Sequence, residues 1–382
     1  MFDTFSSRFR ISRLVMPAII ALALSRFITP APAGAESPVD AFYLKEAPFD
    51  YVKAEKLFGV LKEGGANTII VKLENEKGGM DLDMLTNVTF LAHHAGLKLF
   101  VILATRANDE ALLEHPEWED LRYDLGSGTV QGTNRLDLSL PPVKELLVKK
   151  FKEIAAYSVD GILLGDDFSY SDTEGMGAAM LEAYQRKFGA ALAAGSAFVK
   201  VGGDSGSPKT EVYGQSFWNW AGLKKNVLLE LYQSITRACR EVNSSVQFGI
   251  SVPAMGFVTS NDALAHYSYD MNEFRKLNVD YYWIAVPHRE IRAQQNLNYK
   301  KGMESLMRIV QSTMSMVKDP VKTIVAVQTT SLTGKILPFS EIEEVTALVR
   351  QSGNPGLAFM IDPETPLPGA LSKKLFKRSK NK

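Results

Sequence analysis

Two adjacent carboxylates follow a strongly apolar segment of the chain. Asp166 and Asp167 come directly after the run Val159–Gly165, which is typical of a strand buried on both faces. Ionised carboxylates do not fit a core, so we expect the pair where the strand emerges. Two carboxylates a few Å apart do not ionise easily together, which leaves one of them as an acid near neutral pH. The competing interpretation is that one Asp of the pair, or Asp172, only caps the next helix.

Apolar, β-rich segments alternate with amphipathic segments along the chain. The predicted strands are Asp40–Lys45, Asn67–Leu73, Leu97–Ala104, Val159–Gly165, Val246–Val252, Val279–Val286, Thr323–Thr329 and Gly356–Ile361. The predicted helices include Tyr51–Lys62, Leu82–Ala95, Pro142–Ala156, Trp220–Glu241, Lys300–Val317 and Phe339–Gln351. This alternation indicates a parallel sheet. Eight such units predict an α/β fold, a (β/α)8 TIM barrel with long βα loops after strands 3 and 4. No GxGxxG or P-loop follows a strand, which disfavours a nucleotide-binding open sheet.

The two long loops are expected to shape a substrate cleft, since the loops at the carboxyl end of such barrels usually do. Residues 105–140 follow the third strand, and Gly126-Ser127-Gly128 suggests a mobile flap there. Residues 168–219 follow the fourth strand. They contain a predicted helix over Met176–Phe188 and then, over residues 202–208, a Gly- and Ser-rich segment with the composition of a linker or lid.

Polar and aromatic residues gather where the predicted strands end, and these ends share one rim of a parallel barrel. The candidate catalytic residues are Asp166 and Asp167, and the candidate substrate-binding residues are Glu74, Arg106, Tyr170, Glu174, Trp283, His288, Gln328 and Asp362. Aromatic faces stack on sugar rings, and carboxylates supply an acid and a nucleophile or base, so a carbohydrate suits this rim. Structural roles remain the alternative: Glu74 and Asp362 as loop charges, and Trp283 packed against helices outside the barrel.

The adjacent Asp pair permits a specific mechanism. Glycosidases acting on N-acetylated sugars can use the acetamido group of the substrate as the nucleophile. One carboxylate then orients that group and another protonates the leaving oxygen. The hypothesis is that Asp166 orients and Asp167 is the acid. The competing mechanism is inverting or retaining hydrolysis with a more distant second carboxylate, such as Glu74 or Glu174.

The two ends of the chain differ in composition from the rest. Arg8, Arg10 and Arg13 precede an apolar stretch, and Ala33-Gly34-Ala35 fits the small-residue cleavage rule, which predicts a signal peptide over residues 1–35. The protein is then periplasmic or secreted, with no stable membrane insertion after cleavage; an uncleaved anchor is the alternative. Six basic residues in the last ten predict a disordered tail over residues 371–382, which leaves the barrel to residues 36–370.

The charge of the remaining chain limits its partners. The whole sequence has 43 basic and 43 acidic residues, but without residues 1–35 and the last ten there are 33 basic and 42 acidic ones. An acidic body argues against nucleic acid and suits a neutral or cationic ligand. Cys239 is the only cysteine, so no intramolecular disulfide forms. The five histidines lack metal-binding spacing, so neither a metal nor another cofactor is expected.

Several stretches of the chain resemble a known family, in the same order. The stretches are Arg135-Leu136-Asp137-Leu138-Ser139, Asp160-Gly161-Ile162-Leu163-Leu164-Gly165-Asp166-Asp167, Val327-Gln328-Thr329-Thr330, Ile336-Leu337-Pro338 and Gly356-Leu357-Ala358-Phe359. The second is similar to a DGILFHDDA stretch of that family. Over roughly residues 65–362 the chain resembles the C-terminal glycosidase domain of the periplasmic poly-β-1,6-N-acetylglucosamine N-deacetylases, glycoside hydrolase family 153 in the hypothetical glycosyl hydrolase 13 group.

This resemblance implies a TIM-barrel glycosidase that cleaves partly deacetylated β-1,6-linked N-acetylglucosamine polymer, with Asp166 and Asp167 at the centre of its site. No deacetylase domain is expected, since its metal motif is not present in the sequence. The chain departs from the family at Gly165, where the family has His, and at Met360-Ile361-Asp362, where the family ending is rich in aromatic residues. The alternative function is therefore a catalytically inactive barrel that binds polysaccharide during export or biofilm assembly.

Overall fold

The computed structural model describes residues 38–45, 50–74, 78–193, 197–201, 210–253, 260–331, 334–362 and 369–377. All of these residues belong to one unit that begins at Pro38. The predicted signal peptide and the Gly- and Ser-rich segment over residues 202–208 lie outside the described residues. Within the described residues, no helix combines the length and the apolar character needed to cross a bilayer.

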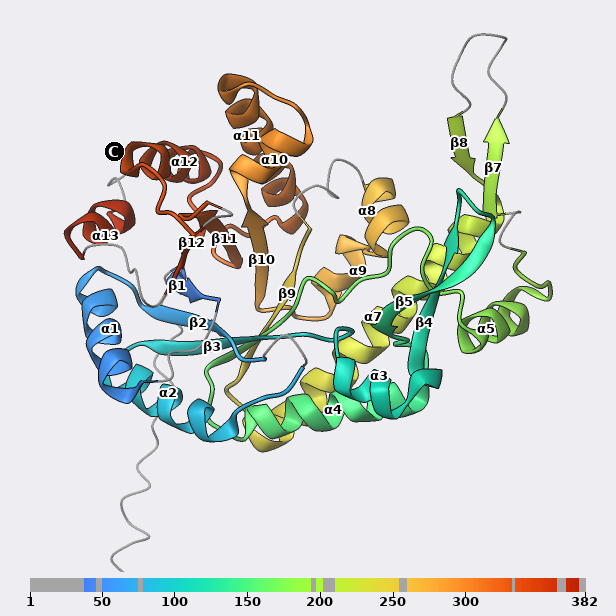
Figure 1. Cartoon of the computed structure of the whole chain (residues 1–382), viewed down its shortest axis with the longest axis horizontal. Coiled ribbons are helices and arrows are strands. Elements are labelled where there is room, and N and C mark those ends of the chain that lie inside the picture. The colour runs from blue at the N-terminus through green and yellow to red at the C-terminus, as the bar shows by residue number, and fades with distance from the viewer. Residues whose placement is uncertain are drawn as a thin grey trace, which may run out of the picture. The chain divides into compact units, whose positions relative to one another are not determined.

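Eight parallel strands close into a barrel, as predicted (Figure 1). Their order around the barrel is β1 (Asp40–Leu44), β12 (Gly356–Ile361), β11 (Thr323–Gln328), β10 (Tyr281–Val286), β9 (Gln247–Ser251), β6 (Gly161–Leu164), β3 (Lys98–Leu103) and β2 (Thr68–Lys72), which pairs with β1 again. Each strand lies within its predicted range. The (β/α)8 TIM barrel expected from the alternating pattern is therefore confirmed.

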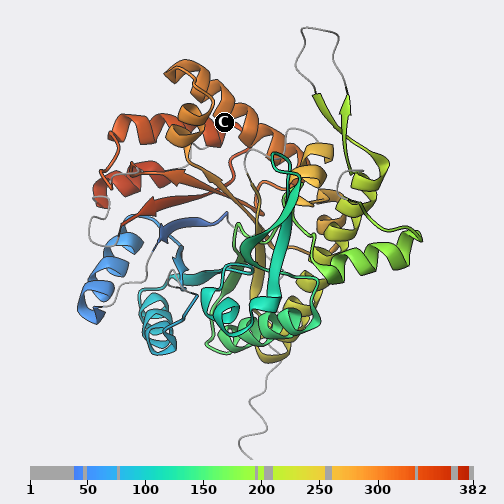
Figure 2. The ribbon, with the colours of Figure 1, turned by 45° about the vertical axis from the view of Figure 1, so that its right-hand side comes forward.

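Helices surround the strands on the outside (Figures 1 and 2). They are α1 (Tyr51–Glu63), α2 (Leu82–His94), α4 (Pro141–Ala155), α7 (Gln215–Val242), α8 (Ser260–Tyr267), α9 (Met271–Lys276), α10 (His288–Gln294), α11 (Tyr299–Val317) and α12 (Phe339–Gln351). Local sequence fixes several starts: the carboxylates of Asp50 and Asp81 accept hydrogen bonds from backbone N–H groups in the first turns of α1 and α2. The six predicted barrel helices are confirmed, although α7 begins five residues earlier than expected.

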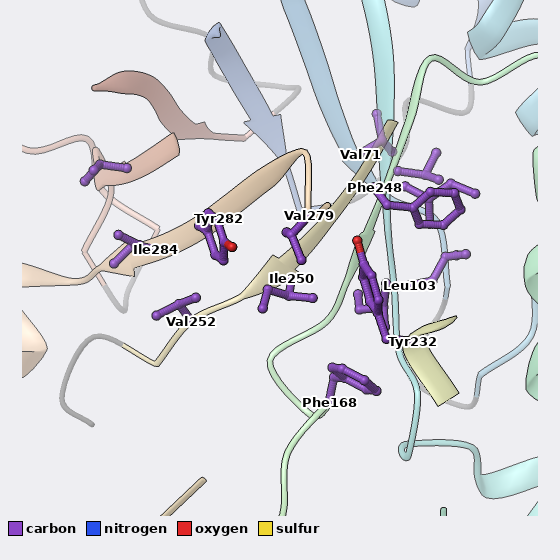
Figure 3. Close-up of a cluster of buried hydrophobic side chains, with 14 of the residues drawn as sticks. Val71, Leu103, Phe168, Tyr232, Phe248, Ile250, Val252, Val279, Tyr282 and Ile284 are labelled. Atoms are coloured by element: carbon purple, nitrogen blue, oxygen red, sulfur yellow. The ribbon is translucent and has the colours of Figure 1, made fainter. Parts of the chain in front are cut away.

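The side chains of each strand alternate between two cores. On β9 and β10, Phe248, Ile250, Tyr282 and Ile284 belong to the larger cluster between the sheet and the helices (Figure 3). The smaller cluster fills the inside of the barrel. Glycine makes room in that interior, because a Cβ added to Gly161 would lie 2.7 Å from the ring of Phe100. Small residues beside large ones are how an eight-stranded barrel fills its interior.

The loop after β3 is more regular than a flap. It contains α3 (Asp109–Glu114), a short 3-10 helix (Pro116–Trp118) and an antiparallel hairpin of β4 (Glu119–Asp124) and β5 (Thr129–Leu136). The Gly126-Ser127-Gly128 segment forms the tip of this hairpin, where Gly128 has a φ of 71°. The loop after β6 holds α5 (Ala178–Phe188) and a second hairpin of β7 (Phe198–Val201) and β8 (Thr210–Tyr213).

Part of the expected disordered tail is helical, and residues 378–382 of it lie outside the described residues. Helix α13 spans Gly369–Phe376, so the residues up to Phe376 are helical. Leu375 and Phe376 are buried, and the ring of Phe376 packs edge-on against Phe42 and Phe359 at centroid distances of 5.3 and 5.1 Å. In the sequence, lysines flank this apolar pair, and their charge led to the prediction of a disordered tail. Burying two such side chains contributes roughly 3–6 kcal/mol, which is enough to hold a short helix in place.

Candidate functional site

A pocket of about 380 Å³ opens at the carboxyl end of the barrel. Its lining residues come from seven of the barrel strands or the turns directly after them, and from β5: Tyr43, Lys72, Ile102, Ala104, Ala107, Arg135, Gly165, Asp166, Asp167, Ser251, Trp283, Ala285 and Met360. Three of the residues predicted from the sequence, Asp166, Asp167 and Trp283, therefore meet in one pocket. This is the rim where TIM barrels place their active sites.

Asp166 presents its carboxylate to this pocket. Its side chain is exposed, and no hydrogen bond or ion pair connects that carboxylate to the described residues. Burial, with the negative charge of Asp166 as the second cause, raises the pKa of Tyr43 to about 12. The Tyr43 hydroxyl is therefore a neutral group at physiological pH. The rings of Tyr43 and Trp283 meet edge-on at 5.4 Å and form an aromatic wall of the pocket.

Asp167 has the opposite environment, since it is buried and holds the loop that follows β3. Its carboxylate accepts hydrogen bonds from the backbone N–H groups of Thr105, Arg106 and Ala107 at 2.6–3.0 Å. The Thr105 hydroxyl donates a further bond at 3.1 Å. Consecutive N–H groups that converge on one anion form a strong, geometrically specific contact. Both oxygens of Asp167 are occupied as acceptors.

Glu74 acts on the same loop from the neighbouring strand. It accepts a hydrogen bond from the backbone N–H of Ala104 and forms a buried ion pair with Lys150 of α4. The Lys150 ammonium also donates to the Ala104 carbonyl at 2.9 Å. Burial raises the pKa of Glu74 and the Lys150 charge opposes that rise. Glu74 and Asp167 together accept hydrogen bonds from four successive backbone N–H groups, those of residues 104–107. Both carboxylates therefore hold the backbone that follows β3 in position.

Arg106, Tyr170 and Glu174 are brought together beside the pocket and do not line it. The guanidinium of Arg106 is fully buried, donates to Glu174 at 2.6 Å and to Asp120 at 2.5 Å, and lies 4.6 Å from the centre of the Tyr170 ring. The same guanidinium also donates to two backbone carbonyls, those of Leu136 and Ser169. This cluster ties the β4–β5 hairpin to the loop after β6.

His288 and Gln328 belong to a second hydrogen-bond network, at the carboxyl ends of β10 and β11. The Nε2 atom of His288 lies 2.9 Å from Glu341, and burial lowers the pKa of His288. Gln328 accepts a bond from the backbone N–H of Arg289 and donates to Glu290 at 2.9 Å. Neither His288 nor Gln328 lines the pocket. Asp362 follows β12, is exposed and also lies outside the pocket lining.

Several residues of the pocket were not among the site candidates chosen from the sequence. Tyr43, Lys72, Ser251 and Met360 lie at its wall. The signal that could have found them is the two-residue alternation of each strand. On β2, for example, Ile70 belongs to the interior cluster, so the next interior position is Lys72, at the carboxyl end.

A closed (β/α)8 barrel with an exposed carboxylate after its fourth strand and an aromatic pair beside it is an architecture that suits glycoside hydrolysis. Comparison with solved structures shows the same class of fold. No protein-family model and no curated protein sequence matches the chain.

The chain is similar to the glycoside hydrolase domain of PgaB (BpsB) from Bordetella bronchiseptica, with a TM-score of 0.69 and 14% identity, over 90% of this chain and 100% of that one. It is also similar to the catalytic domain of a β-amylase from Paenibacillus polymyxa, with a TM-score of 0.59, 13% identity and coverages of 89% and 99%. A β-galactosidase from Marinomonas ef1 matches with a TM-score of 0.61 and 10% identity, over 88% of this chain and 58% of that one. The predicted family resemblance is confirmed at the level of the fold.

Proposed function

We propose that the protein is an exported glycoside hydrolase that cleaves an amino-sugar exopolysaccharide, such as partly deacetylated poly-β-1,6-N-acetylglucosamine. The observation that carries this proposal is the exposed carboxylate of Asp166 in a pocket beside the rings of Tyr43 and Trp283. The barrel shared with glycoside hydrolases supports it at the level of fold.

In this proposal Asp166 is the general acid and Asp167 is a positioning residue. The sequence suggested the reverse assignment, with Asp167 as the acid. The hydrogen bonds favour Asp166 as the acid. Both oxygens of Asp167 already accept hydrogen bonds from the loop after β3, so Asp167 would have to give up one of these contacts to deliver a proton. Asp166 lines the pocket, and its exposed carboxylate accepts no hydrogen bond from the described residues.

The nucleophile in this proposal is the acetamido group of the sugar. Among the described residues that line the pocket, Asp166 and Asp167 are the only carboxylates, and Asp167 is occupied. The acetamido oxygen attacks C1, the C1–O glycosidic bond breaks and the proton of Asp166 passes to the leaving oxygen. Asp166 then takes a proton from the water that opens the cyclic intermediate, which restores the acid. The faces of Trp283 and Tyr43 bind the sugar rings.

The experiment is product analysis by mass spectrometry after incubation with partly deacetylated β-1,6-N-acetylglucosamine polymer. We compare the native protein with Asp166→Asn and with Asp83→Asn, a matched control in which an exposed Asp on α2 is changed. Oligosaccharides from the native protein and Asp83→Asn, and none from Asp166→Asn, are the expected result. Equal products from Asp166→Asn contradict the assigned acid, and no products from the native protein contradict this substrate.

The second candidate function is a catalytically inactive barrel that binds polysaccharide during export or biofilm assembly. The observation that favours it is that the described pocket residues offer one free carboxylate, Asp166, where two-carboxylate hydrolysis needs two. The same incubation separates the two functions. Polymer that binds the native protein and stays intact favours the inactive barrel.

A further inference from the structure

A lysine occupies an interior position at the carboxyl end of the barrel. On β2, Ile69 and Val71 face the helices and Ile70 belongs to the interior cluster. Because strand side chains alternate, Lys72 follows Ile70 on the interior side. Lys72 lines the pocket and its side chain is exposed there. Most other interior positions near the carboxyl end of the barrel, including Ile102, are apolar or small. Packing of the barrel interior therefore does not explain a lysine at position 72.

Among the described residues, Lys72 has no ion-pair partner. No carboxylate of the described residues lies within ion-pair distance of its ammonium group, whereas Lys150, the buried lysine nearby, is paired with Glu74. A charge that lines a pocket without a partner is well placed to meet an opposite charge on a ligand.

Arg135 adds a second positive charge to the same pocket from β5. Its guanidinium lies 3.9 Å from Glu174 and is 43% exposed. The nearer partner of Glu174 is Arg106, at 2.6 Å, so Glu174 compensates Arg135 only in part. Among the described lining residues, the one carboxylate without a hydrogen-bond partner is Asp166.

We propose that Lys72 binds an anionic substituent of the substrate, the carboxylate of an acidic sugar, and that Arg135 strengthens the positive potential around it. This inference rests on the proposed glycosidase function and extends its substrate class to amino-sugar polymers that also carry carboxylates. β2 and β6 are separated by β3 alone, so the strand ends that carry Lys72 and Asp166 lie about 10 Å apart. The carboxylate therefore belongs to a sugar next to the cleaved bond and takes no part in the reaction itself.

The test is binding without turnover, measured by isothermal titration calorimetry on the full chain. The probes are D-glucuronate and D-galacturonate, with D-glucose and D-galactose as their neutral counterparts and D-glucosamine as a cationic probe. We expect the uronates to bind about tenfold more tightly than the neutral sugars, with a preference that weakens as salt is added. Glucosamine is expected to gain no such advantage, because Lys72 repels its ammonium group.

Two variants connect that preference to the lysine. Lys72→Met is expected to abolish the preference for uronates over the neutral sugars. Lys98→Met is the matched control, since Lys98 is an exposed lysine at the opposite, amino end of the adjacent strand β3. Equal binding of uronates and neutral sugars, no detectable binding of uronates, or an unchanged preference in Lys72→Met overturns the inference.

These outcomes are distinguishable from a failure of the proposed function. Hydrolysis of a polymer without uronate preference supports the glycosidase and overturns the acidic-sugar site. A uronate preference that depends on Lys72, with no polymer hydrolysed, supports the site as a binding site and overturns the glycosidase.

Discussion

The two adjacent aspartates should respond in opposite ways to the same substitution. In Asp167→Asn, one oxygen that accepts from the loop after β3 becomes an NH₂ group facing N–H donors. In Asp166→Asn, no hydrogen bond to the described residues is lost, because that carboxylate has none there. We therefore expect Asp167→Asn to lower stability and Asp166→Asn to lower activity alone.

The magnitude follows from the hydrogen bonds. Losing two charge-assisted bonds at about 1.5 kcal/mol each costs about 3 kcal/mol of unfolding free energy. The folded unit, Pro38–Lys382, has about 345 residues. With an unfolding entropy of about 2.1 cal/mol/K per residue, the melting temperature of Asp167→Asn should fall by about 4 °C. Asp166→Asn should change it by less than about 1 °C, since changes at positions without partners stay within about 0.5 kcal/mol.

The assay is thermal unfolding followed by circular dichroism, together with the release of oligosaccharides from partly deacetylated β-1,6-N-acetylglucosamine polymer. Asp166→Asn should lose about 10²–10⁴-fold in activity, the usual contribution of a general acid. Asp83→Asn serves as the control in both measurements. Equal melting temperatures for Asp166→Asn and Asp167→Asn, or full activity in a folded Asp166→Asn, would refute the division of roles.

Other parts of the molecule give further predictions. Lys150→Met leaves Glu74 buried without its counter-charge and should lower the unfolding free energy by about 3–5 kcal/mol in urea denaturation; a variant as stable as the native protein contradicts this. Hydrogen bonds from Arg289 lower the pKa of Glu341 to about 2, so this carboxylate stabilises the fold above its ordinary value of 4.5 and the effect is lost as pH falls towards 2. The difference in melting temperature between the native protein and Glu341→Gln should therefore shrink from about pH 5 downwards, and a constant difference argues against it. Trp283→Leu removes a ring face from the pocket wall and should raise KM for the polymer by up to about tenfold with a smaller change in kcat; an unchanged KM speaks against stacking.

The fold could be predicted because its signals are local. All six residues of β11 (Thr323–Gln328) are buried, and its apolar run over residues 324–327 can be recognised from the sequence alone. The β4–β5 hairpin was missed because its strands are mostly polar and each has a single buried residue, so they lack an apolar period. Helix α13 was missed because its burial depends on Phe42 and Phe359, which are remote in sequence.

The site was predictable only in part. The rim and the Asp pair followed from the strand before them, and Trp283 was a candidate on the sixth predicted strand, which is β10. Arg106 and Glu174 share the rim but pair with each other, and no sequence pattern distinguishes a paired charge from one that faces a ligand. Lys72 could have been found by applying the strand alternation strictly, since a charged residue at an interior position of a barrel is unusual.

The sequence by itself determined the eight-stranded barrel and the position of two carboxylates at its carboxyl end. Both follow from periodicities within single segments, which local sterics and burial impose. Tertiary structure decided which carboxylate is free. The N–H groups that occupy Asp167 come from Thr105, Arg106 and Ala107, about sixty residues earlier in the chain. Only the pairing of β3 with β6 brings these donors to Asp167, and it leaves Asp166 facing the pocket.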